Sequence, residues 1–343
     1  MSTTTLSPPR DRKAEHIRLA LDESLQGPGA SAFDDWYFEH NALPEIDFAE
    51  IDTSVEFLGK KLSAPLLISA MTGGTGLARA INENLARGAE ARRVALALGS
   101  QRKALEDVDQ VASFAVRELA PSVPLLGNLG AVQLNYGFGL DECRAAIEMI
   151  GADALVLHLN VLQEALQPEG NTNFKQLLPA IARLVPQLPV PLVVKEVGAG
   201  LSADVARRLA GVGVRHLDTA GRGGTNWVRI EAQRSGDVPL GELFADWGIP
   251  TPDSIRAVAA VPGVFVIGSG GLRSGLDVAK ALALGADLAG LAFPFLTPAT
   301  ESADAVATRI DRFVRELKIA MLAVGARTIA ELQRTPVHKR SSR

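Results

Sequence analysis

The stretch from Ala154 to Phe174 reads A-L-V-L-H-L-N-V-L-Q-E-A-L-Q-P-E-G-N-T-N-F. Its first four residues, Ala154–Leu157, are apolar, and a short uninterrupted run of this kind is typical of a strand buried on both faces. A His, an Asn, a Gln and a Glu follow within seven residues, before a Pro-Glu-Gly breaker. Barrels and open α/β sheets carry such polar groups at the ligand-binding ends of their strands. The alternative is a solvated strand-to-helix loop.

The composition indicates a globular protein that can bury a large core. The chain has 343 residues, of which 47% are apolar and 22% charged, enough for one large barrel or two domains. A net charge of −4 without a dense basic patch argues against nucleic acid as the main partner. The single Cys143 fits a reducing compartment. Because the first residues lack a signal-peptide core and no apolar run reaches membrane-spanning length, we expect a soluble, cytoplasmic protein.

From residue 64 onward, apolar runs alternate with amphipathic segments about every thirty residues. Eight such repeats predict a (β/α)₈ TIM barrel, because a doubly wound sheet, the alternative, rarely has so many regular units. The predicted strands are Pro65–Ala70, Val94–Leu98, Pro124–Leu126, Ala154–Leu157, Pro191–Val194, Val214–Leu217, Val264–Ile267 and Leu288–Ala292. The predicted helices between them include Leu77–Arg92, Val108–Leu119, Asp141–Ile150 and Ser202–Leu209.

The remaining segments complete the expected organisation of one catalytic domain. Residues 1–63 form an N-terminal arm and a lead-in with a short strand or hairpin, 64–325 the barrel, and 326–343 a C-terminal tail. The segment 222–250 is too long for an ordinary connection and predicts a lid or a subunit contact. The last helix, Asp304–Val324, is expected to close the barrel, and the end of the tail at Lys339 and Arg340 to fray.

Glycines and polar residues follow all eight predicted strands, where barrel enzymes place their functional groups. This regularity weakens the solvated-loop alternative for the opening stretch. The segments are M-T-G-G-T (71–75), G-S-Q-R (99–102), G-N-L-G (127–130), H-L-N (158–160), K-E-V-G (195–198), D-T-A-G-R-G-G-T-N-W (218–227), G-S-G-G-L-R (268–273) and A-F-P (292–294).

Two parts of the chain suggest a phosphorylated ligand. Gly270 and Gly271 lack a Cβ, and the predicted helix from about Ser274 points free N–H groups at the same place, so a phosphate can bind there. The glycines are alternatively turn residues. Arg12 and Lys13 begin a predicted helix, where cations oppose the helix dipole. They are either a solvated basic end or an arm that reaches a phosphate.

Together these motifs resemble the type 2 isopentenyl-diphosphate isomerases, flavoproteins built on an FMN-binding TIM barrel. The resemblance extends from Arg12 to the final helix, and its most specific marks are R-K-A-E-H (12–16), M-T-G-G-T, G-S-Q-R, H-L-N-V-L-Q-E-A-L-Q-P-E-G (158–170) and D-T-A-G-R-G-G-T-N-W. It implies interconversion of isopentenyl and dimethylallyl diphosphate with reduced FMN, Mg²⁺, and NADPH as the usual reductant. It also implies a homotetramer or homo-octamer.

The resemblance also implies roles for individual residues. FMN contacts fall on Met71, Thr72, Gly73, Ser100, Asn128, Lys195 and Thr225, with the FMN phosphate on the backbone of Gly271, Leu272, Arg273, Ala292 and Phe293. The substrate contacts fall on Arg12, Lys13, His16, Ser100, Arg102, His158 and Gln163. Gln163 and Lys195 would be catalytic, Glu164 would bind the magnesium, and Asn160 and Gln167 would support them.

These implied roles agree with the chemistry of the side chains. Mg²⁺ often binds one carboxylate together with substrate phosphates and water, so a single Glu164 suffices; the alternative is that it faces solvent. Lys195 would stabilise an anionic reduced flavin, or else pair with Glu196. An amide is too weak an acid or base to protonate an alkene, so our hypothesis is that reduced flavin moves the proton and Gln163 positions or relays it. His16 and His158 are alternatively ordinary helix and core histidines.

Two other functions compete with this one. FMN-dependent 2-hydroxy acid dehydrogenases and oxidases share Lys195 and the phosphate site, but typically carry a His followed by Gly-Gly-Arg after strand 6, where this chain has Ala220-Gly221-Arg222-Gly223-Gly224. A flavin- or phosphate-binding barrel that acts through partners without catalysis would be expected to lack Gln163, Glu164 or the Arg12–Lys13 pair, and all of these are present. Val161 and Phe293 depart from the expected Pro and Arg; the second predicts weaker retention of FMN, which extensive dialysis would test.

Overall fold

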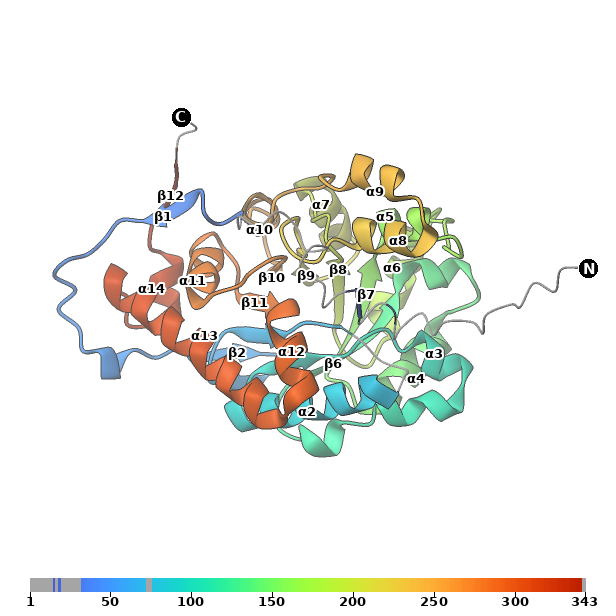
Figure 1. The fold of residues 1–343 in the computed structure, drawn as a ribbon, viewed down its shortest axis with the longest axis horizontal. Helices are drawn as coiled ribbons and strands as arrows, with labels where there is room; N and C mark the ends of the chain where they lie inside the picture. Colours follow the sequence, from blue (N-terminus) through green and yellow to red (C-terminus); the bar gives the residue numbers. More distant parts are fainter. Residues whose placement is uncertain (1–14, 16–17, 20–31, 72–75, 341–343) are drawn as a thin grey trace, which may run out of the picture.

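The computed structural model describes residues 15, 18–19, 32–71 and 76–340. Eight parallel strands close into a barrel, in the order β10-β11-β4-β5-β6-β7-β8-β9 (Figure 1). The predicted TIM barrel is therefore confirmed, and each strand overlaps one of the predicted apolar runs. The strands are β4 (Leu66–Ile68), β5 (Ala95–Ala97), β6 (Leu125–Gly130), β7 (Ala154–Leu159), β8 (Leu192–Glu196), β9 (His216–Asp218), β10 (Phe265–Ser269) and β11 (Leu288–Leu291).

Helices surround the barrel, and several begin at residue types that favour a helix start. The Ser202, Ser274 and Ser302 hydroxyls accept hydrogen bonds from backbone N–H groups three residues on and start α7, α11 and α13. The α-helices are α2 (Gly76–Arg92), α3 (Arg102–Glu106), α4 (Leu140–Ile150), α5 (Val161–Leu166), α6 (Leu177–Leu184), α7 (Ala203–Gly211), α8 (Trp227–Ser235), α9 (Val238–Phe244), α10 (Thr251–Ala259), α11 (Gly275–Ala283), α12 (Phe293–Glu301), α13 (Ala303–Val324) and α14 (Ile329–Gln333). Short 3₁₀ helices are η2 (Phe48–Glu50), η3 (Val108–Ser113), η4 (Arg117–Leu119), η5 (Ala131–Asn135) and η6 (Val185–Gln187).

The predicted helix over Val108–Leu119 is wrong. Two 3₁₀ helices, η3 and η4, occupy this segment instead. The Ser113 hydroxyl donates to the Gln110 carbonyl, and Asn82 of α2 donates through Nδ2 to the Ser113 carbonyl. These side-chain hydrogen bonds compete with the i to i+4 ladder and break the helix at Ser113.

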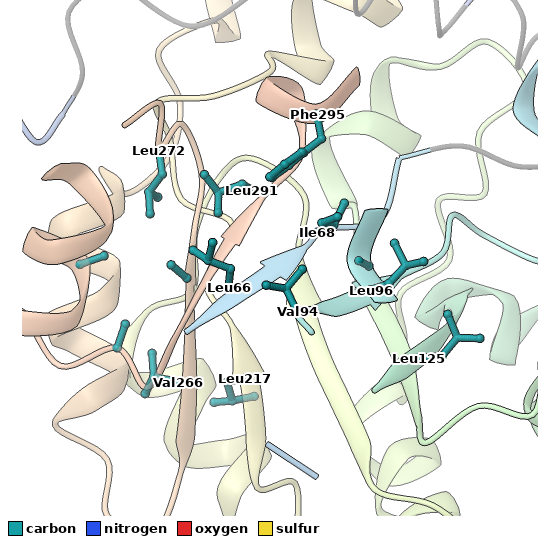
Figure 2. Close-up of a cluster of buried hydrophobic side chains, with 14 of the residues drawn as sticks. Leu66, Ile68, Val94, Leu96, Leu125, Leu217, Val266, Leu272, Leu291 and Phe295 are labelled. Atoms are coloured by element: carbon teal, nitrogen blue, oxygen red, sulfur yellow. The ribbon is translucent and has the colours of Figure 1, made fainter. Parts of the chain in front are cut away.

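The apolar core has two parts. The larger lies between the strands and the surrounding helices, and Figure 2 shows part of it, including Leu66, Leu96 and Phe295. The smaller fills the barrel interior and includes Leu67 and Val156. Phe57 joins the interior cluster from a hairpin of β2 (Val55–Phe57) and β3 (Lys60–Leu62), which confirms the predicted hairpin. The hairpin fills the end of the barrel at which the strands begin.

The prediction that the C-terminal tail frays is wrong at Lys339. β12 (Val337–Lys339) pairs antiparallel with β1 (Trp36–Phe38), far away in the sequence. The Arg256 guanidinium and the Lys339 ammonium lie over the Trp36 ring, 5.4 and 5.5 Å from its centroid. The cation–π attraction adds to the strand pairing. Among the described helices, none combines the length and apolarity needed to cross a bilayer.

Candidate active site

A cavity of about 280 Å³ opens at the C-terminal ends of the strands. Fourteen of the predicted site residues line it, which brings together segments that are more than two hundred positions apart. They are Met71, Ser100, Arg102, Asn128, His158, Gln163, Glu164, Lys195, Thr225, Gly271, Leu272, Arg273, Ala292 and Phe293. The supporting residues Asn160 and Gln167 line it as well. Five further predicted residues, Arg12, Lys13, His16, Thr72 and Gly73, lie outside the described residues.

Helix α5 carries Gln163 and Glu164 to the cavity directly after β7. Glu164 is buried, with only 8% of its surface exposed, so the solvent-facing alternative is wrong. Its Oε1 accepts from Asn160 Nδ2 at 2.9 Å, and its Oε2 accepts from the backbone N–H of Asn171 at 2.5 Å. A buried carboxylate held in this way is available to a cation from the cavity side. Asn160 Oδ1 is buried without a hydrogen bond in the described part of the chain.

Gln163 contacts a residue that sequence reasoning missed. Its Nε2 donates to Oε1 of Glu231 at 3.0 Å. Glu231 is fully buried on α8, which packs on α5 (Figure 1). The length of the segment 222–250 predicts a lid or a subunit contact, but its sequence pattern contains no signal that Glu231 points inward.

Lys195 lies in register with His158 on one neighbouring strand and with Asp218 on the other. Burial raises the pKa of Asp218, while the Lys195 charge and hydrogen bonds from Ser269 and Ala220 act in the opposite direction. Lys195 Nζ donates to the backbone carbonyl of Glu196, not to its carboxylate. The alternative that Lys195 forms a salt bridge with the Glu196 side chain is therefore wrong.

The Glu196 carboxylate turns away to the following loop. Its Oε2 accepts from the backbone N–H groups of Val197 and Gly198, each at 2.7 Å, and from that of Ala199. Burial raises the pKa of Glu196, and these backbone donors lower it. Glu196 therefore shapes the loop after β8 and leaves Lys195 oriented towards the cavity.

His158 is a neutral side chain in this cavity. Burial, with a smaller contribution from the Lys195 charge, lowers its pKa to about 3. Its Nδ1 lies 2.8 Å from Oδ1 of Asn128 on the adjacent strand. His158 would therefore give a bound diphosphate a hydrogen bond. It would not contribute the positive charge expected of a cationic binding site.

The loops after β9 and β10 approach each other closely around Gly271. This residue has a φ of 79°, and a Cβ added to it would lie 2.2 Å from the Gly223 carbonyl oxygen. Only glycine fits, so the backbone itself forms the cavity wall. The backbone N–H of Arg273 donates to Asp277 Oδ2 at 3.0 Å. This N–H, one of the predicted donors to the FMN phosphate, therefore already has an acceptor within the protein.

Two further residues line the cavity: Ser69, for which the sequence predicts no role, and Arg102, a predicted substrate contact. Ser69, at the end of β4, has a buried hydroxyl with no hydrogen bond among the described residues. Arg102 reaches the rim, where its Nε binds Glu106 Oε1 at 2.8 Å and its Nη1 donates to Asn171 Oδ1 at 3.2 Å. Within the described residues, no three His, Cys, Asp or Glu side chains converge as a metal site.

Comparisons with known proteins agree with this geometry. The family of FMN-dependent dehydrogenases matches residues 20–122 and 161–339. An isopentenyl-diphosphate delta-isomerase of Paracoccus zeaxanthinifaciens is 51% identical over 331 residues, covering 94% of this chain and 95% of the relative. One of Nostoc sp. is 47% identical over 337 residues, covering 97% and 96%.

The chain belongs to the FMN-dependent isopentenyl-diphosphate delta-isomerase family. Among solved structures, an active mutant of (S)-mandelate dehydrogenase matches with a TM-score of 0.67 and 20% identity, covering 95% of this chain and 97% of that one. That similarity shows the shared barrel. The isomerase family membership, in contrast, rests on sequence identity along nearly the whole chain.

The cavity fits the flavin that this family uses. The buried Ser69 hydroxyl and Asn160 Oδ1 lack partners within the described residues, as expected of groups that meet a polar ligand. Gly270 and Gly271 line the cavity with backbone alone, which a phosphate can approach without a side chain in the way. These features support FMN at the mouth of the isomerase-family barrel.

Proposed function

We propose that the chain interconverts isopentenyl and dimethylallyl diphosphate, with bound FMN, Mg²⁺, and NADPH as the reductant. The observation that carries the proposal is the pair Gln163–Glu164. Both side chains line the cavity at the C-terminal ends of the strands, and each is fixed by hydrogen bonds to buried partners. The isomerase relatives of similar length support the same reaction.

Glu164 would hold the magnesium together with diphosphate oxygens and water. Mg²⁺ commonly uses one or two carboxylates with substrate phosphates, and Asn160 and the Asn171 amide already fix the orientation of this one. Arg102 at the rim would supply a forked donor to the diphosphate. Arg12, Lys13 and His16 are proposed to add further donors, and Ser100 and His158 would add neutral hydrogen bonds.

FMN would lie across the mouth of the barrel on Met71, Thr72, Gly73, Ser100, Asn128, Lys195 and Thr225. Its phosphate would meet the backbone at Gly271, Leu272, Ala292 and Phe293, and the guanidinium rather than the amide of Arg273. When bound in its reduced form, FMN would supply the acid–base chemistry of the isomerisation. Lys195 would place its positive charge beside the flavin and stabilise an anionic ring.

Gln163 would orient the reacting hydrocarbon. Since its amide donates to Glu231, the carbonyl end of that amide is turned away from Glu231. An amide oxygen can stabilise positive charge that develops on a nearby carbon without itself transferring the proton. Burial of the surrounding groups would exclude water from the carbon that becomes cationic.

An anaerobic assay tests the proposal. The purified protein with FMN, NADPH, Mg²⁺ and isopentenyl diphosphate should produce dimethylallyl diphosphate, and chelation of the metal should stop the reaction. Lactate and mandelate should fail to reduce the bound flavin, since the loop from Ala220 to Gly224 lacks the histidine of the 2-hydroxy acid enzymes. Flavin reduction by either acid without isomerisation would contradict the proposal.

A further inference from the structure

The guanidinium of Arg234, in the last turn of α8, meets carboxylates from three separate segments. Its Nη1 binds Glu231 Oε2 on the same helix, and its Nη2 binds Glu169 Oε1 at 2.9 Å, just beyond α5. Its Nε lies 3.5 Å from Oε2 of Glu15 near the N-terminus. The Arg234 side chain is 10% exposed and that of Glu15 18%, so this pair is shielded from water better than a surface pair.

One of these carboxylates, that of Glu231, contacts a residue of the candidate active site. Glu231 is fully buried, and a buried carboxylate is costly without a partner, which Arg234 supplies. The other oxygen of Glu231 accepts from Gln163 Nε2. Because a carboxylate paired with a guanidinium only accepts hydrogen bonds, the Gln163 amide must turn its NH₂ towards Glu231. Arg234 thus fixes the amide orientation through Glu231.

Another of these carboxylates, that of Glu15, belongs to the N-terminal part of the chain. Leu19 is buried against Ile230 of α8, with Trp227 packed beside them. Glu15 and Leu19 are four residues apart in the sequence, and their partners Arg234 and Ile230 lie four residues apart on one face of α8. We call this pair of contacts the arm contact. Since Trp227 also lines the cavity, α8 joins the arm contact to the site.

We propose that Arg234 is a positioning residue that couples the arm contact to the orientation of Gln163. Glu15 belongs to the R-K-A-E-H motif, which the proposed function assigns to diphosphate binding, and the kinetic part of this inference rests on that function. A diphosphate bound to the motif would favour the arm contact and, through Arg234 and Glu231, the working orientation of the Gln163 amide. Substrate capture and positioning of the reactive side chain would then be linked.

The substitution Glu15→Gln tests this coupling, with Glu169→Gln as the matched control on the same guanidinium. Glu15→Gln should lower kcat/KM about tenfold, with a fall in kcat and a rise in KM, while FMN affinity stays unchanged. The Glu169 side chain is 47% exposed, so the Glu169→Gln variant should stay within about twofold of wild type. In an Arg234→Lys background, which lacks the fork, the effect of Glu15→Gln should shrink strongly.

A second measurement does not depend on isomerisation. Arg18 is exposed beside the arm contact, so Glu15→Gln should speed tryptic cleavage after Arg18, and Glu169→Gln should not. Identical kinetics and cleavage in the two variants would overturn the inference. Faster cleavage in Glu15→Gln, in a protein whose wild type does not isomerise, would instead overturn the proposed function and keep the arm contact.

Discussion

The two ends of the barrel are built from the same strands but have opposite character. At the C-terminal ends of the strands, a cavity exposes polar groups, two of which have no hydrogen bond within the described residues. At the other end, the β2–β3 hairpin inserts Phe57 against Phe265, with ring centroids 5.1 Å apart. One end is left open for a ligand, whereas the other is filled by the chain itself.

A half-buried histidine at each end shows what this difference means chemically. His158 faces the cavity and hydrogen-bonds Asn128, whereas His216 packs against the rings of Phe57 and Phe265. Burial lowers the pKa of both. The same residue type therefore serves binding at one end and packing at the other, and only its neighbours distinguish the two roles.

The largest effect is expected at the filled end. Phe57→Ala would leave a hole in the interior cluster and should lower the free energy of unfolding by about 3–5 kcal/mol. FMN affinity and kcat should stay close to wild type, because the cavity lies at the opposite end. Urea unfolding measures the first and flavin titration the second. The partly exposed Phe48 is the control, and Phe48→Ala should cost about 1 kcal/mol or less. A large loss of kcat in Phe57→Ala would show that the two ends are not independent.

The open end should respond in the opposite way. Glu164→Gln should lower kcat about 100-fold or more, equivalent to roughly 2.7 kcal/mol, and abolish the dependence on Mg²⁺. The amide NH₂ of the new side chain would face either Asn160 Nδ2 or the Asn171 N–H, both of which are donors. Isomerase rates measured across a Mg²⁺ titration check this.

Glu242→Gln provides the control for that variant. Glu242 pairs with Arg229 on the exposed side of α9 and should leave kcat unchanged. If Glu164→Gln kept wild-type activity and Mg²⁺ dependence, the magnesium assignment would be wrong.

The barrel and most of its cavity could be predicted because their signal is local. Each strand is a continuous apolar run followed at once by polar residues, and parallel strands bring those ends together. The predictions are wrong where contacts between residues far apart in the sequence determine the local structure. Lys339 is ordered by a strand pair with residues near Trp36, and Ser113 is drawn out of a helix by Asn82.

The same limit applies to the site. Glu231 meets Gln163 only because α8 folds back over α5, which no periodicity in the sequence indicates. Asp218, by contrast, could have been found, since it ends the strand next to that of Lys195. The neutral state of His158 was not predictable, because it depends on the depth of burial and on the Lys195 charge.

The last expected effect is a pH dependence of stability to which both histidines contribute. The folded-state pKa of His158 is about 3, below its usual 6.5, so the unfolded chain takes up a proton that the folded chain does not. The free energy of unfolding should therefore fall as the pH drops from 6.5 towards 3, by at most about 1.4 kcal/mol per pH unit for this group. Glu196 and Asp218, whose pKa values are raised, contribute with the opposite sign.

The comparison of variants isolates the histidines from those carboxylates. His158→Gln and His216→Gln should both flatten the fall in stability between pH 7 and pH 5, measured by urea unfolding, because each removes one depressed pKa. Only His158→Gln should also raise the KM for isopentenyl diphosphate, since His216 packs against aromatic rings at the filled end of the barrel. Equal KM changes in the two variants would show that His158 contributes packing alone, and the diphosphate would then have to be held by the remaining donors.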